Sequence, residues 1–346
     1  VGFQLGRNQP FLRRFLQLYL ALAGLFALTA LLDYLGVQSP LFEAVGGGQI
    51  IHFRYGFFAT GAIGLWRTTD IAAMHLTIGA CLAIVIAFSG PAGLQRVVWF
   101  LLSAVFALIS LLTGRRKAIV QVVVFVGLFL WLLSRYGTTR SRQQLPGILI
   151  TVAGLAVLAL LLDPTEFLGD DFNEYIARSA SAPGDLLDRF NVLGINAFLR
   201  GLEISNGIGL GVGTLAQTGA SGVAGVSGAG FAFVSESGLG KIAAELGLPG
   251  LVLIGVLLMG LFRSVLYCLR LVRQLPASIG VFEIGLLAFA LSNLPFFSAA
   301  AGVYGDPFIL IICGLCFGSV LAVPDLLSRQ AMELAPFPQR LSTSRV

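Results

Sequence analysis

The sequence predicts an all-α fold: a polytopic transmembrane helical bundle of about eight spans with one long outer loop that contains an amphipathic helix. Of the 346 residues, 57% are hydrophobic and only 11% are charged, and the mean hydropathy is +0.90. Such a chain is too apolar for a soluble domain. The net charge of +5 does not indicate nucleic acid, because most charges lie at the ends of apolar runs and no basic stripe with interleaved aromatic residues is present.

Eight apolar runs are long enough to cross a membrane. At ~1.5 Å per residue, about 16 to 22 helical residues cross a ~30 Å core, the shorter runs with flanking residues that snorkel. The runs are 15–35, 69–89, 96–113, 118–134, 146–162, 247–268, 278–296 and 307–323. The first is too long for a signal peptide, so we expect an anchor helix. Because the chain begins at Val1 rather than Met, the prediction allows for N-terminal truncation and further helices.

These runs divide the chain into four parts. Residues 1–162 carry five N-terminal spans, 163–246 form a long extracytoplasmic loop, 247–325 carry three C-terminal spans, and 326–346 form a cytoplasmic tail. The loop holds ten of the seventeen acidic residues and is the one extramembrane region large enough for a small subdomain. Chemistry on a soluble group is expected there. Residues 36–68, rich in Gly and aromatics, are expected to lie on or re-enter the membrane.

The distribution of Lys and Arg predicts the orientation. With the N-terminus inside, thirteen of the twenty-two fall on the cytoplasmic side, and both termini are cytoplasmic. Five fall in the short outer loops: Arg54, Arg67, Arg115, Arg116 and Lys117. The segment "GRRK" at 114–117 thus faces outward against the positive-inside bias. It favours binding of a phosphate or anionic headgroup, because Arg offers a fork of donors. Anchoring of two helices by snorkelling is the alternative.

Two segments of the long loop carry polar patterns. Residues 185–204 predict an amphipathic helix, for which a solvated surface helix and a binding role are equally good explanations. Its apolar face has Leu186, Phe190, Leu193 and Ala197, and its polar face has Arg189, Asn196, Arg200 and Glu203. The next segment, "NGIGLGVGT" at 206–214, is a Gly-rich turn whose N–H groups can approach a phosphate. It is neither a Walker loop nor preceded by a strand.

A second helix is predicted from "SESGLGKIAAELGLPG" at 235–250, with Ser235 or Ser237 as its cap. Glu236 lies at its start, beside a Gly-rich segment at 218–231 that is expected to be a mobile loop. A carboxylate there can act as a general base, and helix capping is the alternative. Glu245, further along the helix, is expected to make a structural hydrogen bond.

Cysteine and histidine do not predict a metal site. The four cysteines lie in or beside apolar runs, and the CxxC motif at 313–316 has no second ligand pair, so helix packing explains it better than zinc. Both histidines, His52 and His75, precede the long loop. His75, one turn into the second span, is expected to be a hydrogen-bonded polar group rather than a catalyst.

Five features follow one another between residues 54 and 260. They are an outer Arg before a helix ("LWRTTDIAAMHLTIGA"), "TGRRKA", an Arg-led helix in a long outer loop, "GLGVGT" and "ESGLGKIAAELGLPG". The order resembles that of the O-antigen ligase and O-antigen polymerase superfamily of membrane glycosyltransferases. "TGRRKA" resembles the family's "SRGA" turn, "GLGVGT" its "PLLGVGPG", and the last segment its "HNxYLxxLAExGLxG", which is the most specific of these motifs.

The resemblance implies transfer or polymerisation of glycan from an undecaprenyl-pyrophosphate-linked donor to a glycan or lipid acceptor in surface polysaccharide synthesis. It implies a multi-pass protein of the bacterial cytoplasmic (inner) membrane among membrane lipids, with its active site on the outer face and no metal, nucleotide or other cofactor. Glu236 would be the catalytic base. Because it stands where the ligase pattern has His, polymerase-type or exopolysaccharide chemistry is favoured over ligation to a lipid A core. The pyrophosphate would be held by Arg116, Arg189, Arg115, Arg67 and Arg200.

Two other classes stay open from the sequence. A transporter or flippase for a lipid-linked or anionic substrate would mark its pathway with charges inside the spans. Glu283 is the clear charge of this kind, and no pair of matching broken helices suggests inverted repeats. A non-catalytic membrane scaffold would use the outer arginines as lipid anchors.

Overall fold

The computed structural model describes residues 1–37, 39–45, 49–52, 58–143, 145–147, 149, 188, 190–215, 234, 236–299 and 301–334. In this part of the chain six helices are long and apolar enough to cross a membrane, which indicates a multi-pass membrane protein. They are α2 (Gln9–Tyr34), α4 (Thr69–Ser89), α5 (Leu94–Leu112), α6 (Arg116–Tyr136), α14 (Gly238–Val272) and α15 (Ala277–Ser292), which α16 (Leu294–Ala299) continues. A seventh span exists if α17 (Pro307–Leu321) and α18 (Val323–Leu334), bent by 48° at their junction, count as one.

The predicted fold class is confirmed at this level. Helices dominate, and the described residues add one antiparallel hairpin of β1 (Gln49–His52) and β2 (Phe58–Gly61) in the stretch 36–68 that was expected to lie on or re-enter the membrane. Each predicted span within the described residues falls on a helix. The run 146–162 lies almost wholly outside them, so the count of eight stays a prediction. The predicted tail from 326 begins as the continuation of α18.

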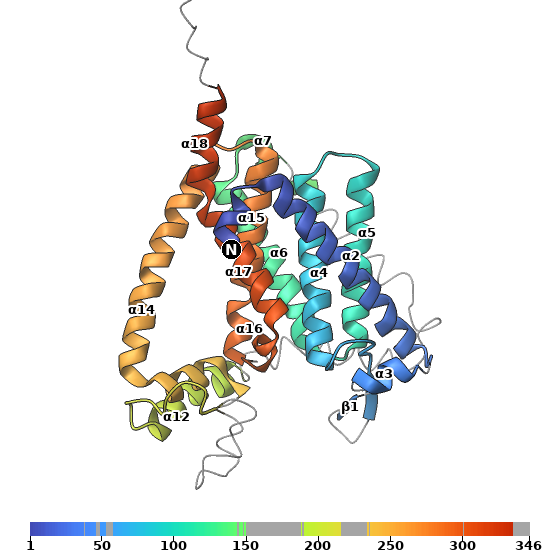
Figure 1. The fold of residues 1–346 in the computed structure, drawn as a ribbon, viewed down its shortest axis with the longest axis vertical. Helices are drawn as coiled ribbons and strands as arrows, with labels where there is room; N and C mark the ends of the chain where they lie inside the picture. The colour runs from blue at the N-terminus through green and yellow to red at the C-terminus, as the bar shows by residue number, and fades with distance from the viewer. Residues whose placement is uncertain are drawn as a thin grey trace, which may run out of the picture.

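The helices run between two ends of the bundle (Figure 1). One end, here called the α12 end, carries α3 (Pro40–Val45), β1, α12 (Ala197–Ile204) and α16. The opposite end, called the α18 end, carries α18, α7 (Thr139–Arg142) and the turn between α4 and α5. The described parts of all the predicted outer segments therefore share one end, as alternating spans require. Which end faces outward stays a prediction from charge.

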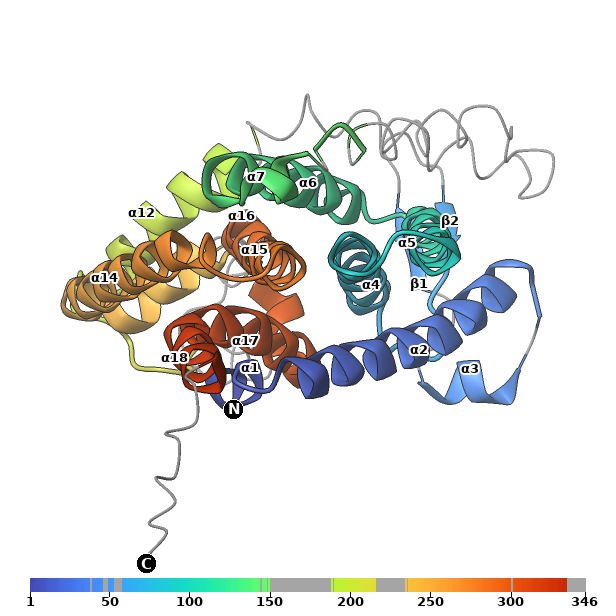
Figure 2. The ribbon, with the colours of Figure 1, turned by 90° about the horizontal axis from the view of Figure 1, so that it is seen from above.

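Helix α4 is the centre of the bundle. It packs against α2, α5, α6 and α15, which surround it when the bundle is seen from above (Figure 2). All of its residues except Asp70 and Ile71 in the first turn are buried, and its sequence consists mainly of small and aliphatic residues. Gly79 brings α5 close: a Cβ at this position would lie 2.9 Å from the ring of Phe106. Small residues at such crossings are typical of helix packing in membranes.

A buried carboxylate joins the N-terminal helices to the C-terminal ones. Glu283 of α15 is fully buried, and its oxygens accept hydrogen bonds from Ser319 Oγ of α17 at 2.6 Å and from Gln9 Nε2 of α2. Gln9 Nε2 also donates to the carbonyl oxygen of Gly6, the last residue of α1 (Gly2–Gly6), at 3.2 Å. An ionisable side chain inside a span needs such partners. Four helices therefore meet at Glu283.

Helix α14 is broken near its start. Gly247 has φ +61°, outside the helical region, and Pro249 has no N–H to donate to the helix ladder. The freed N–H of Leu248 donates to the carbonyl oxygen of Gly207 at 2.8 Å. The first part of α14 lies beside α12 across the α12 end, and the longer part spans the bundle (Figure 1). The helix at 235–250 and the span at 247–268, predicted separately, are thus two arms of one bent helix.

Replacing Gly247 by Ala is expected to lower stability by about 1–3 kcal/mol, because an L side chain is strained at positive φ and its Cβ would collide with the backbone of Ile208. Gly255→Ala is the matched control, since a Cβ there meets nothing within 4 Å and Ala favours the helix. Thermal unfolding of both variants in detergent measures the difference. Equal melting temperatures for Gly247→Ala and the wild type would contradict this role of the break.

Candidate functional site

A charged cluster lies at the α12 end, where the first turn of α4 meets the turn between α5 and α6. Arg115 Nη2 is 3.2 Å from Asp70 Oδ2, and Arg115 Nε donates to Thr69 Oγ1 at 2.8 Å. Lys117 Nζ pairs with the other oxygen of Asp70. Gly114, with φ +68°, allows the tight turn that brings both cations over α4. Two cations thus share one carboxylate.

Asp70 is the member of this cluster that sequence reasoning missed. An acidic residue in the first turn is typical of a helix N-terminus, where the helix dipole favours negative charge, so its position alone did not single it out. All three side chains are partly exposed, and exposed ion pairs are worth only about 0–1 kcal/mol. An incoming phosphate can therefore compete with Asp70 for both cations.

The other predicted arginines are distributed along the same end. Arg67 is exposed in the segment that leads into α4, and Arg116 is the first residue of α6. Arg200 is exposed on α12, where its Nη1 pairs with Glu203 Oε2 at 2.6 Å. The structure does not join Arg200 to the charged cluster by any ion pair among the described residues. Arg189 lies outside the described residues.

The predicted amphipathic helix is confirmed only in part. Its described portion is a π-helix, η1 (Phe190–Asn196), followed by α12. The face that packs is made of small residues: Gly194, Ala197 and Gly201 are buried, whereas Phe190 is exposed. The reason is a close crossing with α14, since a Cβ on Gly240 would lie 2.9 Å from the carbonyl oxygen of Ala197.

Glu236 is exposed just before the first turn of α14. The capping role belongs to its neighbour Ser237, whose Oγ accepts from Gly240 N at 2.9 Å and donates to the carbonyl oxygen of Ser298 at 3.0 Å. Gly238 rests on α16, where a Cβ would come within 2.7 Å of the Phe297 ring. The turn is therefore held in place, while no hydrogen bond or ion pair of the described residues engages the carboxylate of Glu236. It remains available to a substrate.

Glu245 has a structural role, as predicted. It is buried, and its Oε1 accepts a hydrogen bond from Leu215 N at 3.1 Å. The Gly-rich turn at 206–214 closes on the same helix, with Leu210 N donating to Ala244 O at 2.8 Å and Gly211 N to Glu245 O at 3.0 Å. Two of the N–H groups that were expected to approach a phosphate therefore donate to carbonyl oxygens of α14 instead.

His75 is held by three aromatic and acidic partners. Its Nδ1 shares a hydrogen bond of 2.8 Å with the hydroxyl of Tyr19 on α2, and its Nε2 lies 3.8 Å from Asp306 Oδ1. The ring stacks on Trp66 with 6.2 Å between centroids. Asp306 in turn caps α17 by accepting from Phe308 N at 2.8 Å. The geometry fits the expected hydrogen-bonded polar group, which here ties α2, α4 and α17 together.

A second polar network surrounds Asn293, which caps the C-terminus of α15. Gln121 Nε2 of α6 donates to Asn293 Oδ1 at 3.0 Å, and the hydroxyl of Tyr304 donates to Asn293 O at 2.9 Å. Tyr304 belongs to the short helix η2 (Ala301–Gly305), and burial raises the pKa of its hydroxyl well above the ordinary value. It therefore stays a neutral donor. The network fixes η2, which contacts the start of α14, to the bundle.

The described residues contain no group of three His, Cys, Asp or Glu side chains that could hold a metal ion. Comparisons with known protein families, curated proteins and solved structures give no match to this chain.

Proposed function

We propose that the protein is a membrane glycosyltransferase that transfers or polymerises glycan from an undecaprenyl-pyrophosphate-linked donor, on the outer face of a bacterial inner membrane. One observation carries this proposal. The α12 end combines a cluster with excess positive charge around Arg115 with an exposed carboxylate, Glu236, whose helix is capped by another residue. Anion binding and proton removal are the two tasks that transfer from a lipid pyrophosphate requires.

The donor pyrophosphate would bind at the charged cluster. Arg115 and Lys117 face one carboxylate, so one positive charge is left over, and Arg67 and Arg116 add further charge at the same end. Asp70 keeps the guanidinium of Arg115 oriented before the donor arrives, which lowers the cost of ordering it. Arg189 completes the set in this proposal, and Arg200 joins once its exposed pair with Glu203 opens.

In the transfer step, Glu236 takes the proton of the attacking acceptor hydroxyl. The hydroxyl oxygen forms a bond to the anomeric carbon of the donor glycan, and the bond from that carbon to the pyrophosphate oxygen breaks. The leaving undecaprenyl pyrophosphate keeps the electron pair. The guanidinium groups stabilise this developing charge, because fixed donors aimed at a leaving group cost no reorganisation during reaction.

Arg116→Lys and Arg189→Lys are each expected to reduce glycan synthesis about 10- to 100-fold although the charge is kept, because Lys cannot offer a bidentate fork to phosphate oxygens. Surface polysaccharide of cells that carry each variant gives the readout, with protein levels checked in the membrane fraction. Arg140→Lys at the α18 end is the control and should leave the polymer unchanged. Full synthesis by both test variants would argue against a pyrophosphate clamp, and normal polymer in a deletion strain would favour the transporter or the scaffold.

A further inference from the structure

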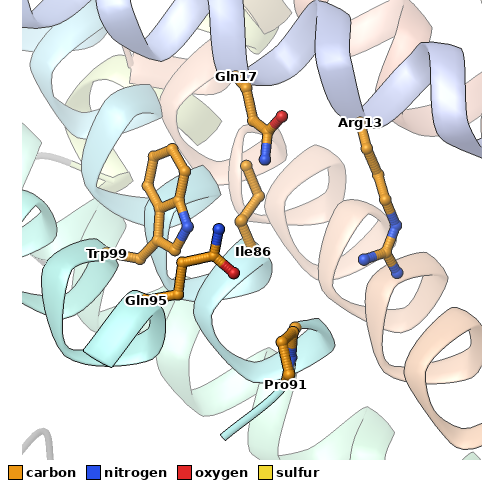
Figure 3. A pocket seen from close by; sticks show the side chains of 7 residues that line it. Arg13, Gln17, Ile86, Pro91, Gln95 and Trp99 are labelled. Carbon is orange, nitrogen blue, oxygen red and sulfur yellow. The ribbon is translucent and has the colours of Figure 1, made fainter. Parts of the chain in front are cut away.

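A pocket of about 100 Å³ opens at the α18 end, away from the proposed active site. It lies where α2 passes the turn between α4 and α5, and Arg13, Gln17, Gln95 and Trp99 supply its polar and aromatic lining (Figure 3). Gly90 and Pro91 of the turn close one side. Nothing in the proposed transfer reaction uses this pocket.

Arg13 brings a half-buried charge to the pocket, and no described residue forms an ion pair with it. Its Nη2 donates to Ser278 O at 3.1 Å and its Nη1 to Ser89 O at 3.4 Å, and the guanidinium lies 4.5 Å from the centroid of the Phe282 ring. No carboxylate of the described residues lies within ion-pair distance of it. The charge of Glu283 acts on Arg13 without forming an ion pair with it, and the Glu283 oxygens already accept hydrogen bonds from Gln9 and Ser319.

The other groups at the pocket favour an anion as well. Gln17 from α2 and Gln95 from α5 extend their amides toward each other beside the Trp99 indole (Figure 3), so amide and indole N–H donors face the same space. The C-terminus of α4 would oppose an anion with roughly half a negative charge. Arg96 covers that end by donating to Ala87 O at 3.1 Å and Gly90 O at 3.2 Å. The two positive charges of Arg13 and Arg96 therefore exceed the partial negative charge at the C-terminus of α4.

The surroundings indicate where such an anion comes from. The pocket lies at the end of two membrane-crossing helices, and α5 continues from it with exposed apolar side chains, among them Leu94, Val98 and Leu101. Trp99 lines the pocket, and Trp is enriched at membrane–water interfaces, where its ring lies at the level of the headgroups. Acyl chains can therefore lie along α5 while the headgroup enters the pocket.

We propose that this pocket binds the phosphate group of an anionic glycerophospholipid from the adjoining leaflet. The Arg13 guanidinium contacts the phosphate oxygens, the Gln17 and Gln95 amides donate to them, and the exposed apolar side of α5 carries the chains. Because Arg13 also holds the carbonyl oxygens of Ser89 and Ser278, the bound lipid joins α2, α4 and the start of α15 at this end.

Native mass spectrometry of the purified full chain in a neutral detergent, titrated with dioleoylphosphatidylglycerol, tests the proposal. We expect one tightly bound lipid, an affinity at least about 10-fold lower for Arg13→Gln, and no change for Arg14→Gln, the exposed neighbour on the same helix. Gln95→Leu removes a donor from the pocket and leaves the hydrogen bonds of Arg13 in place, and it should weaken lipid binding several-fold. This second variant tests the pocket even if Arg13→Gln does not fold. Dioleoylglycerol, which lacks phosphate, should not bind.

Three results would overturn the proposal. Unchanged binding by both Arg13→Gln and Gln95→Leu would show that the lipid does not use the pocket. An equal loss in Arg14→Gln would indicate unspecific attraction to the basic end of the chain. Displacement of the lipid by inorganic phosphate at millimolar concentration would show a site for free phosphate instead of a headgroup.

Discussion

Glu236→Gln in the purified protein is expected to slow glycan transfer by roughly 10²- to 10⁴-fold while leaving donor binding unchanged. The amide keeps the size and hydrogen-bonding reach of the side chain but cannot take the proton of the acceptor hydroxyl. Folding should not change, because the carboxylate is exposed and Ser237 makes the cap of α14. Initial rates and donor affinity of the two proteins in detergent give the comparison.

Glu245→Gln, on the helix that follows Glu236, is the matched control. Its Oε1 accepts from Leu215 N, and an amide oxygen can keep that hydrogen bond, so both the rate and the melting temperature should stay near those of the wild type. A Glu236→Gln enzyme that turns over at the wild-type rate would place the base elsewhere or make one unnecessary. His75, held between Tyr19 and Asp306, is then the next residue to replace.

Glu283→Ala is expected to lower the free energy of unfolding by about 2–5 kcal/mol, whereas Glu283→Gln should cost much less. Ala leaves a cavity and strands the donors of Gln9 and Ser319 inside the bundle, where water does not replace the lost acceptor. Gln keeps one acceptor oxygen and the volume. Melting temperatures in detergent measure both effects.

A different result for Glu283→Ala and Glu283→Gln would assign Glu283 another role. If Glu283→Gln and Glu283→Ala both unfold like the wild type but alter the passage of a charged solute, the carboxylate belongs to a pathway rather than to a structural junction. That result would support the transporter hypothesis. The Glu283 variants therefore distinguish the glycosyltransferase from the transporter. They also test the packing of α1, α2, α15 and α17.

The spans were predictable because their signal is local. The run 69–89 coincides with α4, since Thr68 caps the helix, Asp70 lies in its first turn and Gly90 follows its end. The bent start of α14 was harder to predict, because "ELGLPG" at 245–250 indicates a break in the helix but not the direction of the chain after it. The partner of Leu248 N is Gly207, forty-one residues earlier, and no periodicity encodes such a contact.

The sequence indicated the residue types of the candidate site, which stays a prediction, but not the contacts that these residues make. The arginines assigned to the outer side were singled out because that placement runs against the positive-inside bias, and Glu236 because its segment resembles a family motif. Asp70, which holds Arg115 and Lys117, looks like an ordinary first-turn acid. The contact between Gln121 and Asn293 joins helices far apart in the chain, and its residue types are ordinary in either helix. Such pairings arise from tertiary packing alone.

Reconstitution of the purified protein into liposomes with an undecaprenyl-pyrophosphate-linked oligosaccharide tests the central claim most directly. The account predicts elongated or transferred glycan and an equal amount of released undecaprenyl pyrophosphate, both lost in Glu236→Gln and kept in Glu245→Gln. Intact donor, with no release of undecaprenyl pyrophosphate by the wild-type protein when an acceptor is present, would contradict it.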